Sequence, residues 1–376
     1  MGNKIKLKVR DKMYQLNNFS DIKRKNFLNR RGFLINGSKI IILSGLPNLY
    51  FKNLHAGFIS NKRYTQSPDQ RSDTNYISKK DNKFNINIYY FTGTGNSLAV
   101  ARGLASRLGG YIMPVAALIK RESIPIDTEG AGIVFPVYHS GLPLIIKRFV
   151  EKLVSIEDKY LFAVCTYGGS VGLAIKNVRE LLKEKRGILQ TGFGIHMPYN
   201  YLTPRFTLRD FYGSFTLREI SLKKQKSLIK KSAEKINKIA DYIQNRQTGK
   251  YEVTYEPLTR LADALNLEES MGKSSWLKIA GVKEDTDLSF IESRQLMDKA
   301  FRADNNCISC GTCVRICPVD NIVLNNKPEW LNHCEQCFAC LHWCPEQAIQ
   351  FGDNTAGRKR YHHPNIKLAD MIRQAS

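Results

Sequence analysis

The chain has 376 residues, of which 43% are hydrophobic, and it carries a formal net charge of +23. That length and composition predict a globular protein of two or three domains, and no 18-residue apolar stretch predicts an integral membrane span. The charge alone would suggest a nucleic acid or an anionic membrane as partner. No RNA-binding or DNA-binding motif supports the first, so we expect no nucleic-acid partner and leave peripheral membrane association open.

The first 84 residues form a basic N-terminal extension with 18 Lys or Arg and 5 Asp or Glu. Within it, Arg30 and Arg31 precede a mildly apolar stretch over residues 35–51 and resemble a twin-arginine export signal. A lysine and a proline interrupt this stretch, and no convincing A-x-A cleavage site follows. Two locations therefore stay open, the cytoplasm and export through this signal.

A phosphate-binding loop is predicted where a strand over residues 86–91 gives way to a helical pattern starting near Leu98. Glycines let a backbone wrap around an anion, hydroxyls donate to it, and the helix N-terminus adds unpaired N–H groups. The dinucleotide fingerprint needs a glycine where Leu98 stands, and the Walker lysine is absent. The loop instead resembles the FMN-phosphate loop of flavodoxins, although a hydroxyl-rich helix cap is the alternative. Its residues are Thr92, Gly93, Thr94, Gly95, Asn96 and Ser97.

Two further predicted strands, over residues 132–135 and 160–166, end in loops that suit a flavin. Ligands of a parallel doubly wound sheet bind outside the carboxyl ends of its strands, where these loops would converge. Tyr138 is our candidate for stacking on the isoalloxazine, with an ordinary exposed loop tyrosine as the alternative; His139 is expected at the surface, and Cys165 in a buried strand. The loop residues expected at the flavin are Pro136, Val137, Tyr138, Thr166, Tyr167, Gly168 and Gly169.

A long amphipathic helix is predicted before Thr248 and Gly249, which should end it. Lysines occupy its outer face, and we expect its apolar side to pack on the sheet rather than on a membrane. The apolar positions are Leu222, Ile229, Ile236, Ile239, Ala240 and Ile243.

Eight of the nine cysteines form a tandem of two C-x2-C-x2-C-x3-C-P runs. In such runs three thiolates bind one iron–sulfur cluster and the fourth binds the other. A disulfide framework or a pair of zinc sites is the alternative, but structural zinc sites use other spacings. The sequence therefore predicts two [4Fe-4S] clusters. Cluster one would use Cys307, Cys310, Cys313 and Cys344, and cluster two Cys334, Cys337, Cys340 and Cys317.

Together these motifs resemble the EFR-type flavodoxin–ferredoxin fusion family, whose members join a flavodoxin-like domain to a C-terminal dicluster ferredoxin. The resemblance covers about residues 85–366, and the N-terminal extension departs from it. It implies an α/β flavodoxin-like doubly wound parallel sheet followed by a small α+β bacterial dicluster ferredoxin domain. The predicted parts are an extension (1–84), a flavodoxin-like domain (85–250), a connecting segment (251–299), a ferredoxin domain (300–352) and a basic C-terminal tail (353–376).

The function that follows is electron transfer through FMN and two [4Fe-4S] clusters to or from a protein redox partner, because flavin converts pair chemistry into single-electron chemistry. An electron carrier is favoured over a substrate-specific enzyme. Two alternatives remain: an FMN-dependent reductase of a quinone or nitro compound fed by the clusters, and a ferredoxin whose flavodoxin-like domain has lost flavin and serves in docking or sensing.

Overall fold

The computed structural model describes residues 34–36, 39–41, 84–199, 220–253, 277, 281, 289–352 and 355–375. The chain divides into two compact units, Met1–Ser78 and Lys79–Ser376. In the first unit, strands β1 (Leu34–Asn36) and β2 (Lys39–Ile41) pair antiparallel. Arg30 and Arg31 lie outside the described residues, as does most of the connecting segment, so the export signal stays a prediction.

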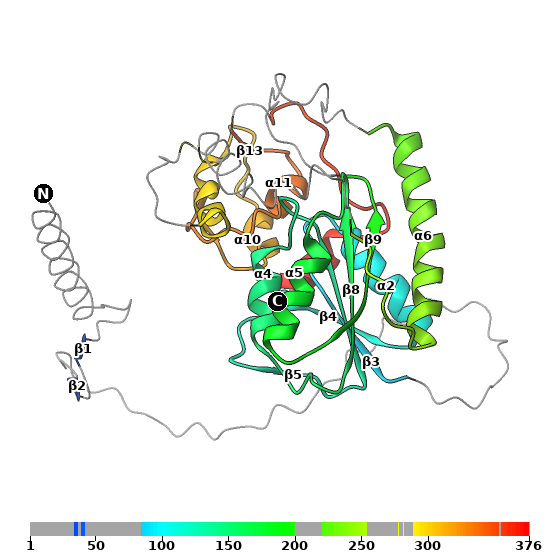
Figure 1. Ribbon diagram of the computed structural model, residues 1–376. Coiled ribbons are helices and arrows are strands. Elements are labelled where there is room, and N and C mark those ends of the chain that lie inside the picture. Colours follow the sequence, from blue (N-terminus) through cyan, green and yellow to red (C-terminus); the bar gives the residue numbers. More distant parts are fainter. Residues whose placement is uncertain are drawn as a thin grey trace, which may run out of the picture. The chain divides into compact units, whose positions relative to one another are not determined.

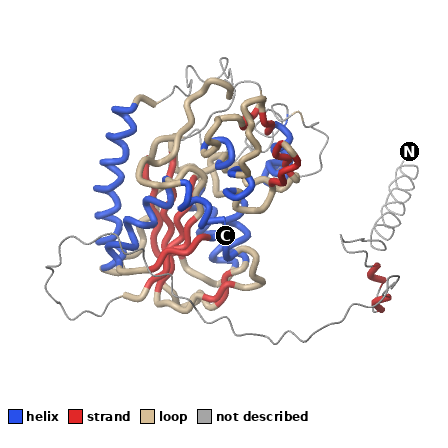
Figure 2. Tube along the Cα trace, turned by 180° about the vertical axis from the view of Figure 1, so that it is seen from behind, coloured by secondary structure: helices blue, strands red, loops and turns tan. Residues whose placement is uncertain are grey.

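The second unit is built on a five-stranded parallel sheet (Figures 1 and 2). Its spatial order is β4-β3-β6-β8-β9, which numbers as 2-1-3-4-5 along the chain and is the order of flavodoxin-like doubly wound folds. The predicted fold class is thereby confirmed. The strands are β3 (Ile86–Tyr90), β4 (Tyr111–Pro114), β6 (Gly130–Pro136), β8 (Tyr160–Tyr167) and β9 (Leu189–His196).

The central strands are apolar because helices cover both faces of the sheet. Strands β6 and β8 are buried over nearly their whole length, and Cys165 is a buried β8 residue, as predicted. Helices α2 and α6 pack together, and α4 packs against α5 (Figure 1). Helix α4 also contacts α3. Two short strands, β5 (Ile124–Pro125) and β7 (Leu153–Val154), form a separate parallel pair. The helices of this module are α2 (Asn96–Leu108), α3 (Val115–Leu118), α4 (Leu144–Glu151), α5 (Ala174–Glu184) and α6 (Leu222–Gln244).

Helix α6 packs its apolar side on the rest of the sheet module, as predicted, and buries Ile236, Ile239, Ala240 and Ile243. Two details of the prediction are wrong. Leu222 is 74% exposed because it begins the first turn, and Leu228 is buried instead. The helix also ends at Gln244, before the predicted stop, since Arg246 adopts a positive φ of 50° that a helix cannot continue.

Residues 300–352, the cysteine-rich module, combine two antiparallel strand pairs with two short helices, which is the predicted α+β arrangement. Phe301, Phe338 and Phe351 pack edge to face in its core. The pairs are β10 (Phe301–Ala303) with β13 (Ile349–Phe351) and β11 (Ile322–Asn325) with β12 (Lys327–Trp330); the helices are α10 (Thr312–Ile316) and α11 (Ala339–His342), preceded by α9 (Phe290–Ser293) and the 3-10 helix η2 (Arg294–Ala300).

The C-terminal segment is more than the basic tail that the sequence suggested. It ends in helix α12 (Leu368–Ala375), and Ile366 and Met371 are buried in the same apolar core as the sheet. Trp343 of the cysteine-rich module belongs to that core too, so the two modules and this segment pack as one body. Among the described residues, the helices include none that is long and apolar enough to cross a membrane.

Candidate flavin site and cluster ligands

Two separate cavities in the cysteine-rich module are each lined by four cysteines. Cavity one has Cys307, Cys310, Cys313 and Cys344, and cavity two has Cys317, Cys334, Cys337 and Cys340. These are the two groups that the tandem pattern assigns to two clusters, with the fourth cysteine of each run crossing to the other group. Their role as ligands stays a prediction. In the described part of the chain, His, Cys, Asp and Glu do not gather in threes closely enough for a single metal ion.

The two cavities differ in their access to solvent. Cys310 of cavity one is exposed, and the neighbouring Ile308 is 64% exposed. Three cysteines of cavity two are buried, Cys317, Cys337 and Cys340, against only Cys313 in cavity one. Burial raises the pKa of Cys337 to about 12 and that of Cys313 to about 11. Thiolates at these positions need a cationic partner, which is what the iron atoms of a cluster supply. Cavity one therefore lies at the outside of the module and cavity two in its interior.

The predicted phosphate loop joins β3 to α2, and its hydroxyl side chains, Thr92, Thr94 and Ser97, are buried. Gly95 has a φ of 92°, which favours glycine, and it caps the helix. Its N–H donates to Thr92 Oγ1 at 3.0 Å, which closes the loop on itself. Ser97 Oγ lies 2.9 Å from Thr166 Oγ1, so the loop also contacts the end of β8. The hydroxyl-rich turn thus stands at the N-terminus of a 13-residue helix, the arrangement that binds phosphate groups.

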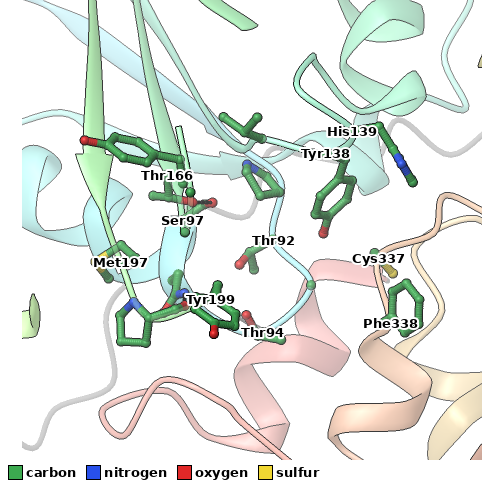
Figure 3. A pocket seen from close by; sticks show the side chains of 18 of the residues that line it. Thr92, Thr94, Ser97, Tyr138, His139, Thr166, Met197, Tyr199, Cys337 and Phe338 are labelled. Carbon is green, nitrogen blue, oxygen red and sulfur yellow. Dashed lines mark hydrogen bonds between the residues drawn. The ribbon is translucent and has the colours of Figure 1, made fainter. Parts of the chain in front are cut away.

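One pocket of about 300 Å³ brings the three predicted loops together (Figure 3), a volume at the lower end for small-ligand sites. Of the predicted flavin residues only Gly95 does not line it, because Gly95 packs against Ile366 on the other side of the loop. The predicted residues that line the pocket are Thr92, Gly93, Thr94, Asn96, Ser97, Pro136, Val137, Tyr138, Thr166, Tyr167, Gly168 and Gly169.

Tyr138 and His139 form the side of the pocket that follows β6 (Figure 3). The Tyr138 hydroxyl is buried without a hydrogen-bond partner, and burial raises its pKa well above the usual value. His139 is half-buried in the pocket wall, so the expected surface position is wrong. Burial, with a contribution from the charge of Arg294, lowers the pKa of His139 to about 3, and its imidazole is neutral at pH 7.

Two further segments line the pocket that the sequence analysis did not name. Residues 197–199 follow β9, and Asn96 Nδ2 donates to the Pro198 carbonyl at 2.9 Å. The end of β9 lies beside the end of β8, so strand order alone could have indicated this segment. Residues 336–338 come from the cysteine-rich module, and no local pattern in the sequence signals their contact with the sheet module.

The segment 335–338 attaches the cysteine-rich module to this pocket. Glu335, which is 0% exposed at its side chain, forms a salt bridge with Arg148 and accepts from the N–H of Ile145 at 2.8 Å. Burial raises the pKa of Glu335 despite the Arg148 charge. A Cβ added to Gly93 would overlap the Cys337 carbonyl and lie 2.8 Å from the Tyr138 hydroxyl. The phosphate loop and a cysteine of cavity two are therefore in direct contact.

The residues present fit a flavin mononucleotide. The phosphate loop supplies hydroxyls at a helix N-terminus, and the loops after β6 and β8 line the space beside it. Gln336 lines the same pocket, and both its side-chain oxygen and nitrogen are buried without a partner, as is the Tyr138 hydroxyl. Buried polar atoms are nearly always paired, so these three mark a wall that a polar ligand completes.

Residues 304–323 match the family model described as a 4Fe-4S binding domain, which includes the first cysteine run. This part of the chain is thus an iron–sulfur segment. No curated protein matches the chain. Among solved structures, a putative flavoprotein from Bacteroides uniformis is 21% identical, with a TM-score of 0.25 over 30% of this chain and 90% of its own.

Two other solved structures are similar to part of this chain. The Megasphaera elsdenii flavodoxin is 16% identical, with a TM-score of 0.23 over 30% of this chain and 85% of its own. An azoreductase from Bacillus anthracis is 10% identical, with a TM-score of 0.27 over 42% of this chain and 98% of its own. These scores are too low to add to the strand order, which by itself assigns the fold.

Proposed function

We propose that this protein is an electron-transfer flavo-iron–sulfur protein that carries one FMN and two [4Fe-4S] clusters. The loop Thr92–Ser97 would hold the FMN phosphate, Tyr138 would contact the isoalloxazine, and the backbone of residues 166–169 would contact its polar edge. The two cysteine groups would hold the clusters. A bound flavin supplies exchange between two-electron and one-electron chemistry, and the protein contributes position and tuning.

The observation that carries this proposal is a shared wall. Cys337 and Phe338 line both the flavin pocket and cavity two. A ligand of cluster two is thereby also part of the flavin site, and no other residue has to separate the two cofactors. A docking or sensing domain that had lost its flavin would not need a cluster ligand in the wall of a hydroxyl-lined pocket.

The solvent exposure of the two cavities supports an order in which electrons pass between FMN and the two clusters. Cavity two lies against the flavin pocket, whereas cavity one has the exposed Cys310 and the exposed apolar side chain of Ile308 beside it. We assign the sequence FMN, cluster two, cluster one, redox partner, or its reverse. An apolar residue at the outer end suits a transient protein contact, since such interfaces have a small apolar centre.

The test is a count of cofactors on one anaerobically purified sample of the full chain. We expect about one FMN and about eight iron and eight sulfide per chain. Iron near four would leave one cluster and remove the relay. Iron near eight without flavin would overturn the flavin half and favour a ferredoxin with a structural sheet domain.

A further inference from the structure

The phosphate loop is held from its outer side by the C-terminal segment. The side chain of Gln374, which is fully buried, makes two hydrogen bonds to one residue of the loop. Its Oε1 accepts from the Thr92 N–H at 2.8 Å, and its Nε2 donates to the Thr92 carbonyl at 2.9 Å. A carboxamide that satisfies both backbone groups of Thr92 fixes the peptide orientation at the point where the loop leaves β3.

Three more residues of this segment contact the loop. The His363 N–H donates to the Thr94 carbonyl at 2.8 Å, and the Tyr361 hydroxyl donates to Asn96 Oδ1 at 2.8 Å. A Cβ at Gly95 would lie 2.9 Å from Ile366, so Ile366 fills the space that the left-handed glycine leaves. We call this set the C-terminal brace: Tyr361, His363, Ile366 and Gln374.

The brace is anchored to both modules. Asp370 of α12 pairs with Arg102 of α2 at 2.9 Å, which ties the segment to the helix that the phosphate loop begins. Trp343 stacks on His362 and donates from Nε1 to the Gly93 carbonyl at 3.1 Å. Trp343 directly precedes Cys344, a cysteine of cavity one. The conformation of the loop is thus linked to the folded state of the cysteine-rich module.

Resting on the proposed function, we infer that the C-terminal brace positions the phosphate loop and so determines the preference of this site for a phosphorylated flavin. A loop that is ordered before binding loses less conformational freedom when the ligand arrives, and preorganisation of this kind raises affinity. The brace contacts the loop from outside the pocket, so its members are positioning residues. Their loss weakens the grip on the phosphate and leaves the ring contacts in place.

The experiment compares FMN with riboflavin, which lacks the phosphate. Flavin-free full-length protein with its clusters intact is titrated with each flavin, and the two Kd values are taken from fluorescence quenching. Gln374→Leu keeps the size of the side chain and removes both hydrogen bonds. We expect it to raise the Kd for FMN about tenfold, as the loss of two hydrogen bonds predicts, and to change the Kd for riboflavin less than about twofold.

Two further variants keep the test decisive. Ala369 lies on the exposed side of the same helix, so Ala369→Gln is the matched control and should change neither Kd. Tyr361→Phe removes only the hydroxyl that bonds Asn96, and it should lower the FMN preference in the same direction by a smaller factor. Iron content and thermal unfolding of each variant show that it is folded and loaded.

The outcomes separate this inference from the proposed function. A wild-type protein that binds neither flavin contradicts the proposed function itself. A wild-type protein that prefers FMN, with Gln374→Leu and Tyr361→Phe that keep the full preference, overturns the brace. Equal losses of FMN and riboflavin affinity overturn it as well, because they indicate general destabilisation of the pocket.

Discussion

The cysteine-rich module and the flavin pocket are assembled in opposite ways. All eight cysteines of cavities one and two fall within residues 307–344, in two copies of one short pattern. The flavin pocket takes its lining from five separate segments between residues 92 and 338, and its phosphate loop depends on contacts as far as Gln374. A site of the first kind tolerates changes elsewhere in the chain, whereas a site of the second kind is sensitive to the contacts between modules.

The largest effect is expected from single cysteine replacements. Cys317→Ala should remove cluster two, which it shares with Cys337, and Cys344→Ala should remove cluster one, which it shares with Cys310. Each variant should lose about half of the iron. Iron content measures this loss, and the EPR spectrum of the reduced variant identifies the cluster that remains. Cys165→Ala, in the buried strand, should keep all of it.

The crossed assignment is contradicted if the EPR spectrum of Cys317→Ala matches that of Cys310→Ala. In that case each cysteine run would bind its own cluster, and the two halves of the motif would be independent.

The next largest effect is expected at the salt bridge between Arg148 of the sheet module and Glu335 of the cysteine-rich module. Arg148→Ala leaves the Glu335 carboxylate buried without its cation, which should lower the free energy of unfolding by about 3–5 kcal/mol. Anaerobic denaturant titrations of wild type and variant measure this change. The double variant Arg148→Leu with Glu335→Leu removes both charges and should regain most of the loss. A drop below about 1 kcal/mol for Arg148→Ala would mean that the pair acts as a surface salt bridge.

A steric change at Gly93 should weaken the flavin pocket more than it weakens the clusters. The added methyl of Gly93→Ala overlaps the Cys337 carbonyl, so segment 336–338 has to shift from the phosphate loop. Overpacking of this kind costs about 1–3 kcal/mol, and we expect the Kd for FMN to rise about tenfold. Iron should fall by a smaller factor, since the shifted segment carries Cys337. Gly141→Ala is the matched control, because its nearest neighbour would be an ordinary 3.5 Å away. Unchanged FMN binding in Gly93→Ala would show that the modules do not need this contact.

The smallest effect at neutral pH is expected at His139, where it takes the form of a pH dependence of stability. Its pKa is about 3 in the folded protein against 6.5 in an unfolded chain, so between these values the unfolded state binds the proton and the folded state does not. Stability from this group is present above pH 6.5 and is lost as the pH falls toward 3.

His139→Asn tests this dependence, since asparagine tolerates the positive φ of 48° at this position. Between pH 7 and 5 the free energy of unfolding should fall more steeply in the wild type than in the variant. Parallel profiles would show that the folded protein protonates His139 normally.

The cysteine groups lie close together in the sequence and the pocket residues do not, and this difference determines how much of each site the sequence predicts. The tandem spacing predicts the two cysteine groups that line the cavities, and the strand–loop–helix pattern predicts the turn between β3 and α2, because each pattern lies in one short stretch of the chain. Phosphate binding by that turn stays a prediction. The prediction for His139 is wrong because this residue lies in the pocket wall, at a reversal with positive φ at residues 139 and 140 that no local pattern indicates. Segment 336–338 reaches the pocket, and Gln374 reaches the phosphate loop from outside it, only through tertiary packing, which periodicity does not encode. Export through the signal at Arg30 and Arg31 stays a prediction, because both residues lie outside the described part of the chain.

In the proposed function, flavin and cluster two exchange electrons within one molecule through the wall that they share at Cys337. Flash photoreduction of the FMN in the anaerobic, fully loaded protein, followed by the bleaching of the clusters, tests it directly. We expect a cluster reduction rate that does not change with protein concentration and that is lost in Cys317→Ala. A rate that rises in proportion to protein concentration, or that survives in Cys317→Ala, would contradict it.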